Sequence, residues 1–208
     1  RLTTPEMDEV LESMEAQARE SGFPTVGPDV GAFLRLCARL VDADSVFEFG
    51  SGYGYSAYWV APALPSDGQI VLTEVDRDEL EQAREYLSRG GYDDRAVFEQ
   101  GDAIETVEHY DGPFDLVLID NENHRYIDAF EAVREKLAPG GVVIADNVIT
   151  ATGQFDPEEL RAVLEDDHEP ESENLAGIAD YYHHVRTDPA FETVLVPIGE
   201  GVTVSVRL

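Results

Sequence analysis

Short apolar runs alternate with longer amphipathic segments along most of this chain. Seven of the apolar runs predict strands, at residues 46–50, 69–73, 95–99, 113–119, 141–145, 192–197 and 202–206. The segments between several of these runs have helical periodicity, most clearly residues 77–89. Strands that alternate with helices are typical of a parallel sheet covered by helices on both faces. We therefore expect an α/β fold that ends in an antiparallel hairpin.

The chain reads as one domain. Its 208 residues contain no visible linker or internal repeat, and a chain of this length buries roughly 70% of its unfolded surface. An amphipathic helix from Met7 to Ala18 precedes the first strand and would pack either across a partner or back on its own sheet. The acidic stretch 166–174 predicts a surface excursion. Within a single domain, 1–208, we expect N-terminal helices (1–44), a ligand-binding core (45–147), a segment overhanging the site (148–190) and a C-terminal hairpin (191–208).

The net charge is −30, from 44 acidic and 14 basic residues, and Lys136 is the only lysine. Such a charge weakens a compact fold in dilute salt, but at about 1 M salt the Debye length falls to roughly 3 Å and screens most of the repulsion. The composition resembles that of proteins from salt-loving archaea. It argues against a nucleic-acid partner, because the sequence contains no basic stripe that could replace phosphate counterions.

Cys37 is the single cysteine and lies in an apolar helical pattern, so we expect a small buried hydrophobe and no disulfide. No signal-peptide pattern opens the sequence, and no apolar run approaches the 18 residues of a membrane span. We expect a cytoplasmic protein with no membrane partner.

A glycine turn follows the first predicted strand, with glycines at 50, 52 and 54 before a helical pattern. Glycine lets the backbone turn sharply and approach a ligand, and the helix that follows directs its free N–H groups at that ligand. The last glycine comes one residue too early for the dinucleotide fingerprint. This spacing favours another adenosine-bearing ligand, although a glycine turn without a ligand is the alternative.

The pattern E-x-G-x-G-x-G after an apolar strand resembles motif I of the class I S-adenosylmethionine-dependent methyltransferases. The resemblance implies a doubly wound, mostly parallel seven-stranded sheet in the order 3-2-1-4-5-7-6, with the last strand antiparallel. It also implies cofactor contacts along the motif, at Glu48, Gly50, Gly52 and Gly54.

Two acids follow the next strands. Glu74 ends the second strand, where a carboxylate can accept both hydroxyls of a ribose, and Asp102 follows the third, where it can accept from an adenine amino group. The segments E-V-D and G-D-A, which include Glu74, Asp102 and Ala103, are similar to the ribose and adenine contacts of this superfamily. For Glu74, the alternative is a solvated acid in an acidic protein.

From about Val26 onward the chain resembles one branch of the superfamily, the catechol-type and caffeoyl-CoA-type metal-dependent O-methyltransferases. The resemblance implies a backbone contact from Val26 to the methionine portion of the cofactor and places Ser56 near its carboxylate. Residues 114–120 and 139–147 complete the similarity. Their strand-end sequences Ile-Asp and Ala-Asp-Asn are similar to the metal site of this branch.

Parallel strands lie about 4.8 Å apart, so Asp120 and Asp146 at the ends of neighbouring strands can converge on one cation, with Asn147 adding a neutral oxygen. Hard oxygen ligands suit Mg²⁺, Mn²⁺ or Ca²⁺ and do not suit zinc. In the alternative interpretation, Asp146 caps the next turn and Asp120 only touches the cofactor.

The implied reaction is attack of a hydroxyl oxygen on the sulfonium methyl group of S-adenosylmethionine, with a divalent cation lowering the hydroxyl pKa. The family usually places a lysine as base where this chain has Asn123, and an amide cannot take a proton. His124 is the nearest residue with a suitable ordinary pKa. Either His124 assists, or the cation alone generates the oxyanion and water removes the proton.

The predicted acceptor is a small catechol-like hydroxyl compound. Residues 148–182 should overhang the site, with Phe155, Tyr181 and Tyr182 available to an aromatic ring.

Relatives are often dimers, so we expect a homodimer. Two alternatives remain: a tRNA or rRNA nucleoside methyltransferase on the same fold, and a protein that binds the cofactor with little catalysis.

Overall fold

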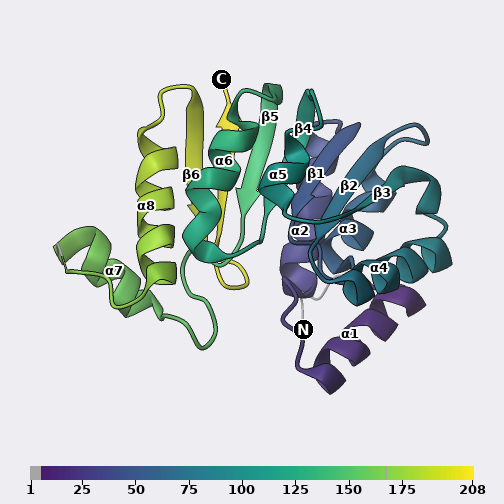
Figure 1. The fold of residues 1–208 in the computed structure, drawn as a ribbon, viewed down its shortest axis with the longest axis horizontal. Helices are drawn as coiled ribbons and strands as arrows, with labels where there is room; N and C mark the ends of the chain where they lie inside the picture. The colour runs from purple at the N-terminus through teal and green to yellow at the C-terminus, as the bar shows by residue number, and fades with distance from the viewer. Residues whose placement is uncertain (1–5, 167) are drawn as a thin grey trace.

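The computed structural model describes residues 6–166 and 168–208, so residues 1–5 of the predicted N-terminal segment and residue 167 of the predicted excursion lie outside it. One seven-stranded sheet has the order β3-β2-β1-β4-β5-β7-β6, and only the pairs that involve β7 are antiparallel (Figure 1). The predicted topology is confirmed. The strands are β1 (Ser45–Phe49), β2 (Gln69–Glu74), β3 (Ala96–Gln100), β4 (Phe114–Ile119), β5 (Leu137–Ala145), β6 (Phe191–Val196) and β7 (Val202–Arg207).

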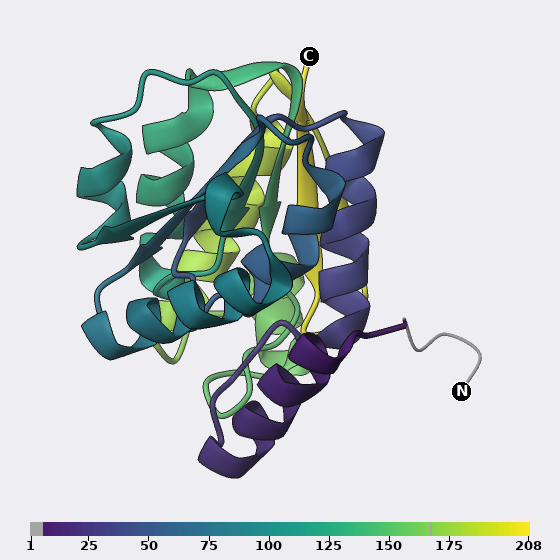
Figure 2. The same cartoon turned by 90° about the vertical axis from the view of Figure 1, so that its right-hand side faces the viewer.

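Helices cover both faces of the sheet, as Figure 2 shows for α2 on one side and α6 on the other. The α-helices are α1 (Glu9–Ser21), α2 (Gly27–Leu40), α3 (Tyr55–Val60), α4 (Arg77–Gly90), α5 (Ala103–Val107), α6 (Tyr126–Arg134), α7 (Pro157–Asp166) and α8 (Glu173–Thr187). Three short 3-10 turns join them: η1 (Ala61–Ala63), η2 (Asp93–Arg95) and η3 (Asn123–Arg125). No helix of these described ranges is both long and apolar enough to cross a membrane.

Alternate residues of the central strands enter two separate cores. Val46 and Leu116 pack with helices α1 to α4, whereas Phe47 and Val117 pack with helices α5 to α8. This alternation follows from the two-residue period of a strand, and because both faces are covered, most residues of the central strands are apolar. Cys37 is buried in the first core, as predicted, and burial raises the pKa of its thiol to about 11.

The register of the central strands determines where the site forms. Phe49 pairs with Ile119, and Ile119 pairs with Ala145, all in parallel strands. The next residue of each strand is therefore brought to the same edge of the sheet: Gly50, Asp120 and Asp146. The backbone continues this alignment, since Asp120 N donates to Phe49 O at 3.0 Å and Asp146 N donates to Ile119 O at 3.2 Å.

Helix α1 folds back on its own domain and lies beside α4 (Figure 1). Its N-cap Asp8 accepts from two helix amides, and Gly22 ends it in a left-handed conformation. Leu11 and Met14 are buried in the first core, and the Tyr53 hydroxyl donates to Met14 O at 3.2 Å. Within the chain, the helix packs against α3 and α4.

The segment after β5 differs from the prediction. Phe155 and Tyr181 belong to the second core and do not reach toward a ligand; Tyr181 packs edge-on against Tyr126 and its hydroxyl lies 3.3 Å from that of Thr203. Aromatic side chains bury large apolar areas, and here both rings are buried against the apolar face of the outer part of the sheet. The expectation that these two rings contact a substrate is therefore wrong. The predicted excursion, 166–174, is shorter in the structure: residues 168–172 lie between the helices, whereas 166 ends α7 and 173 and 174 begin α8.

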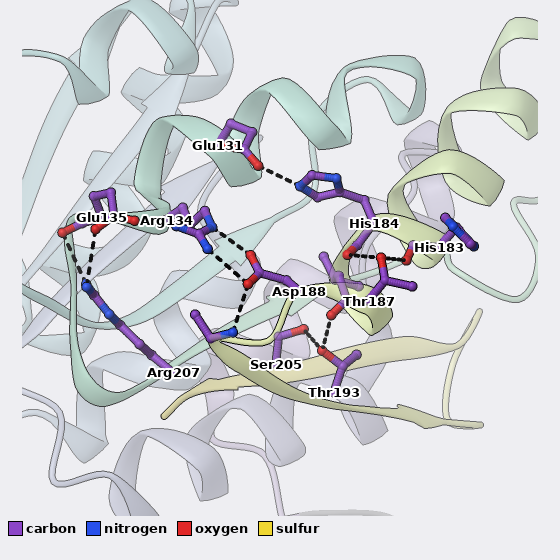
Figure 3. Close-up of polar contacts among 12 residues, drawn as sticks. Glu131, Arg134, Glu135, His183, His184, Thr187, Asp188, Thr193, Ser205 and Arg207 are labelled. Carbon is purple, nitrogen blue, oxygen red and sulfur yellow. Dashed lines mark hydrogen bonds and ion pairs between the residues drawn. The ribbon is translucent and has the colours of Figure 1, made fainter.

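A charged cluster ties the outer helices to the end of the sheet (Figure 3). Arg134 on α6 donates to Asp188, which follows α8, with its Nε at 2.6 Å and Nη2 at 2.9 Å. The Asp188 side chain is 6% exposed, and Arg134 holds the pKa of this carboxyl below its ordinary value. On the same side, His184 contacts Glu131 at 2.6 Å.

Candidate functional site

A cavity of about 820 Å³ opens at the carboxyl ends of the central strands. This is the edge at which ligands bind in open α/β sheets, and the size suits a cofactor together with a small substrate. Its walls come from the α1–α2 loop, the glycine turn, the ends of β2 to β5, residues 151–154 and the β6–β7 loop. Of the predicted site residues, the lining includes Val26, Gly50, Gly52, Ser56, Glu74, Asp102, Ala103, Asp120, Asn123, Asp146 and Asn147.

The glycine turn after β1 has the backbone that its sequence predicts. Gly50, Gly52 and Gly54 all have positive φ, at 77°, 49° and 82°. At Gly50, an added Cβ would lie 2.5 Å from the carbonyl oxygen of Asp120, so even alanine would collide with the backbone of the neighbouring strand end. The turn therefore needs glycine at position 50 for two reasons, conformation and space.

Glu48 and Gly54 belong to the turn but do not line the cavity. Glu48 is 1% exposed and accepts a hydrogen bond from the hydroxyl of Ser56, which does line the cavity. Burial raises the pKa of Glu48 to about 8, while the bond from Ser56 opposes that rise. Gly54 faces α4, and a Cβ added at Gly54 would lie 2.9 Å from the Cβ of Ala83. The structure thus places these two residues beneath the site.

Glu74 holds the turn from the side. Its Oε2 accepts from Gly52 N at 2.9 Å and its Oε1 accepts from Asp76 N at 2.9 Å. A carboxylate offers about four lone-pair positions, so two stay available toward the cavity that Glu74 lines. This arrangement is compatible with the predicted role as a ribose acceptor.

Asp102 has partners that the sequence did not predict. Its Oδ1 caps α5 by accepting from Ile104 N at 2.8 Å, and its Oδ2 forms an ion pair with Arg125 at 2.7 Å. Arg125 is the main reason that the pKa of Asp102 lies below its ordinary value. Arg125 also lines the cavity. Nothing in the local sequence pattern indicated this pair, since it joins the N-cap of α5 to the turn η3, 23 residues further along the chain.

The two predicted metal-ligand carboxylates lie at the strand ends that the register brings together. Asp146 is 3% exposed, and its Oδ1 has no hydrogen-bond partner in the described structure. Burial raises the pKa of Asp146 to about 7, and burial together with the neighbouring Asp146 raises that of Asp120. Asp120 is half-buried and Asp146 is buried, and the charge of Asp146 acts on Asp120, so a cation between the two carboxylates would be favourable.

Carboxylates alone do not complete a metal cage. Within residues 6–166 and 168–208, no group of three or more His, Cys, Asp or Glu side chains is arranged to hold a metal ion. Asn147 is the third predicted ligand, and its φ of 58° is left-handed, a conformation that asparagine tolerates better than most residues. Asn147 lines the cavity, and its Nδ2 donates to Glu200, which leaves its side-chain oxygen without a partner among the described residues. The unpartnered Asp146 oxygen and this hard-oxygen set fit Mg²⁺ or a similar cation that keeps several waters.

Comparison with known proteins agrees with this geometry. A family model described as O-methyltransferase matches residues 3–208. The chain belongs to the O-methyltransferase family. It is 34% identical over 148 residues to the catechol O-methyltransferase of Niastella koreensis, which covers 68% of this chain and 67% of the relative. It is 26% identical over 194 residues to the caffeoyl-CoA O-methyltransferase of Petroselinum crispum, covering 88% and 77%.

Two solved structures of O-methyltransferases superpose over nearly the whole chain. The O-methyltransferase TomG of Streptomyces achromogenes, in complex with SAM, has a TM-score of 0.84 at 27% identity and covers 97% of this chain and 91% of TomG. An O-methyltransferase of Bacillus cereus, in complex with SAH, also has a TM-score of 0.84, at 25% identity, and covers 98% and 92%.

The two residues of this O-methyltransferase that were predicted as catalytic, Asn123 and His124, lie in η3 after β4. Asn123 is buried, 6% exposed, and lines the cavity. His124 is exposed and does not line it. The backbone of His124 packs against Gly177 of α8, where an added Cβ would lie 2.4 Å from the His124 Cα. The structure thus brings Asn123, and not His124, together with the carboxylates.

Glu200 lines the cavity of this O-methyltransferase but was not predicted from the sequence. It lies in the β6–β7 loop. Its Oε2 accepts from Asn147 Nδ2 at 2.8 Å, its Oε1 accepts from Thr152 N at 3.1 Å, and it also accepts from the Thr152 hydroxyl. A glutamate between two glycines of a hairpin loop carries no signal of a binding site, because its partners are distant in sequence.

Proposed function

We propose that this protein transfers the methyl group of S-adenosylmethionine to a hydroxyl of a small, catechol-like acceptor beside a divalent cation. The observation that carries this proposal is the single cavity in which the glycine turn, Glu74 and the Asp120, Asp146 and Asn147 group share one edge of the sheet. The names of the similar catechol and caffeoyl-CoA enzymes, and the SAM bound in the TomG structure, support the same reaction class.

The cofactor would occupy the half of the cavity formed by β1, β2 and β3. The free amides of the glycine turn and Ser56 suit the methionine carboxylate, and Glu74 suits the ribose hydroxyls. At the far end, Asp102 and the backbone of Ala103 suit the adenine edge. Arg125 then orients Asp102 by occupying one of its carboxylate oxygens.

The acceptor would lie between the methyl group and the carboxylates. Asp120 and Asp146 would hold the cation, and Asn147 would add its neutral oxygen. When bound, a divalent cation supplies the positive charge that lowers the pKa of the hydroxyl. The acceptor oxygen then attacks the methyl carbon in line while the carbon–sulfur bond breaks.

The structure supports a mechanism without a nitrogen base. The described residues that line the cavity include no histidine and no lysine, and Asn123 cannot accept the hydroxyl proton. We therefore propose that water removes this proton. Asn123 and the carboxylates act by positioning the acceptor.

The test is methyl transfer to a panel of catechols at high salt, with EDTA and with Mg²⁺ restored. We expect activity to disappear with EDTA and to return with Mg²⁺. Asp146→Asn should abolish transfer while calorimetry still detects binding of S-adenosylhomocysteine. The matched control is Asp111→Asn, an exposed acid outside the cavity, which should behave as the wild type. Full activity of Asp146→Asn would contradict the metal assignment, and cofactor binding with no transfer to any acceptor would contradict the enzymatic proposal.

A further inference from the structure

Three side-chain amides from three separate elements meet beside the cavity. The Oε1 of Gln154, in the turn between β5 and α7, accepts from Asn174 Nδ2 at 2.7 Å and from Asn123 Nδ2 at 3.4 Å. Asn174 lies in the first turn of α8, and Asn123 begins η3. Gln154 and Asn123 both line the cavity, whereas Asn174 does not. We call these residues the amide cluster.

The backbone fixes the position of each member. The turn that contains Gln154 is closed by the bridge between Ala151 and Phe155 and is anchored by the burial of both. Helix α8 approaches η3 closely because Gly177 has no side chain. A Cβ added at Gly177 would lie 2.7 Å from the backbone carbonyl oxygen of Asn123. The amide cluster therefore lies on a framework of packed backbone.

Hydrogen-bond capacity determines what the amide cluster presents to the cavity. A carbonyl oxygen has two lone pairs, and the two asparagine donors fill those of Gln154. This leaves both N–H groups of the Gln154 amide and the side-chain oxygen (Oδ1) of Asn123 without a partner among the described residues. Gln154 is an exposed residue that lines the cavity, and the side-chain oxygen of the buried Asn123, which also lines it, is not among the fully buried unpaired atoms. The wall thus offers an uncharged donor next to an uncharged acceptor.

The rest of the wall is strongly acidic. The described lining contains six acidic residues and a single basic one, Arg125. Arg125 is 2.7 Å from Asp102 and 3.7 Å from Glu122, so its charge is already compensated. The six acids are Glu74, Asp102, Asp120, Glu122, Asp146 and Glu200. Even with one divalent cation bound, this wall repels an anionic group.

We propose that Gln154, held by Asn123 and Asn174, is a specificity-determining residue that donates to an uncharged oxygen of the acceptor, and that the cavity rejects acceptors carrying a carboxylate or phosphate. This inference rests on the proposed function, and it narrows the acceptor class to neutral or cationic hydroxyl compounds. Asn174 is a positioning residue, because it touches Gln154 and not the cavity.

A matched pair of acceptors tests the charge preference: 3,4-dihydroxybenzyl alcohol and 3,4-dihydroxybenzoate, which share the ring and the vicinal hydroxyls. We expect kcat/KM for the alcohol to exceed that for the benzoate at least tenfold, mainly through KM. The dissociation constants of the two compounds, measured by calorimetry with S-adenosylhomocysteine and Mg²⁺ present, should show the same order. Equal dissociation constants would overturn the proposal even if no methyl transfer occurred, so its failure is distinguishable from that of the enzymatic proposal.

Gln154→Glu separates recognition from structure. The carboxylate still accepts from both asparagines, so the thermal midpoint should not change, but the donor toward the acceptor is lost and a negative charge is added. We expect KM for the alcohol to rise about tenfold. The control Gln69→Glu adds the same charge at an exposed position at the start of β2, away from the cavity, and should leave KM unchanged. An unchanged KM in Gln154→Glu would overturn the role of Gln154.

Asn174→Ala tests positioning. It removes the 2.7 Å bond to Gln154 without altering the cavity wall. We expect KM for the alcohol to rise about threefold at constant kcat. A fall in kcat with KM unchanged would contradict a role in acceptor binding.

Discussion

Asn147, at the end of β5, donates its side-chain amide to Glu200 of the β6–β7 loop at 2.8 Å, across 53 residues of sequence. This bond joins the antiparallel hairpin to the parallel part of the sheet, and both residues line the cavity. Glu200 also holds the backbone of Thr152, so one carboxylate organises two walls of the site.

Removal of the Glu200 side chain should loosen both walls. We expect Glu200→Ala to lower the free energy of unfolding by about 1–3 kcal/mol, because charge-assisted bonds to Asn147 and Thr152 are lost. Denaturant titration at high salt measures this change. Glu192→Ala, an exposed glutamate of the same hairpin, is the control and should have little effect. Equal effects of the two substitutions would contradict the anchoring role of Glu200.

Gly50→Ala should impair both folding and cofactor binding. The new Cβ would lie 2.5 Å from the Asp120 carbonyl oxygen in a left-handed backbone conformation. Gly22→Ala has a similar φ of 73° but meets no atom within 4 Å, so it should cost only about 1 kcal/mol. We expect Gly50→Ala to cost about 2 kcal/mol more, since it adds a backbone collision. Thermal unfolding and calorimetry with S-adenosylhomocysteine check both effects, and similar behaviour of the two variants would refute the space argument.

His124→Ala should leave methyl transfer within about twofold of the wild type, because the side chain is exposed and outside the cavity. The pH dependence of kcat should also be unchanged. The comparison variant is Asn123→Ala. Asn123 is the neighbouring residue in sequence and its side chain does line the cavity, so the KM of this variant should rise. Loss of turnover in His124→Ala with normal cofactor binding would show that His124 acts as the base.

Arg134→Met should destabilise the protein by about 1–3 kcal/mol at pH 7, because it leaves the buried Asp188 carboxylate without its charged partner. Arg134 lowers the folded-state pKa of Asp188, so its stabilising effect is present above the unfolded pKa of about 3.9 and is lost as the pH falls through the folded value. The difference between wild type and variant should therefore shrink below about pH 4.

Acid and denaturant titrations of both proteins measure this pH dependence. Arg161→Met is the control, since Arg161 and its partner Glu165 are both exposed, and it should show no measurable change. A stability difference for Arg134→Met that is independent of pH down to acid unfolding would contradict the linkage with Asp188.

Raising KCl from about 0.1 to 1 M should increase the thermal midpoint, because the Debye length falls from about 10 Å to about 3 Å and the repulsion of a −30 chain is screened. NaCl should give the same midpoint at equal ionic strength if screening is the cause. A constant midpoint, or one that depends on the cation, would contradict the proposed salt adaptation.

Several features of the fold and site follow from local patterns. Strand periodicity predicted the sheet, and the resemblance supplied its order. The rule that parallel strands end at one edge was enough to place Gly50, Asp120 and Asp146 together, as the register confirms. Apolar helical spacing likewise predicted that Cys37 is buried.

Other features depended on how distant segments pack. Phe155 and Tyr181 were expected near a substrate, but the outer sheet offered a larger apolar surface and they joined the core. Asn123 and His124 are adjacent in sequence, and the short turn η3, pressed against Gly177, sends one inward and leaves the other exposed. No periodicity applies to so short a turn.

The sequence by itself determined the order of helices and strands, the glycine turn and the acids at the strand ends, because these depend on local spacing. Only the tertiary structure decided that Arg125 engages Asp102, that Glu200 holds Asn147, and that Gln154 joins two asparagines. Each of these contacts joins side chains from loops or helix ends that are far apart along the chain. Their geometry is set by the packing of both elements, which leaves no repeating signal in the sequence of either.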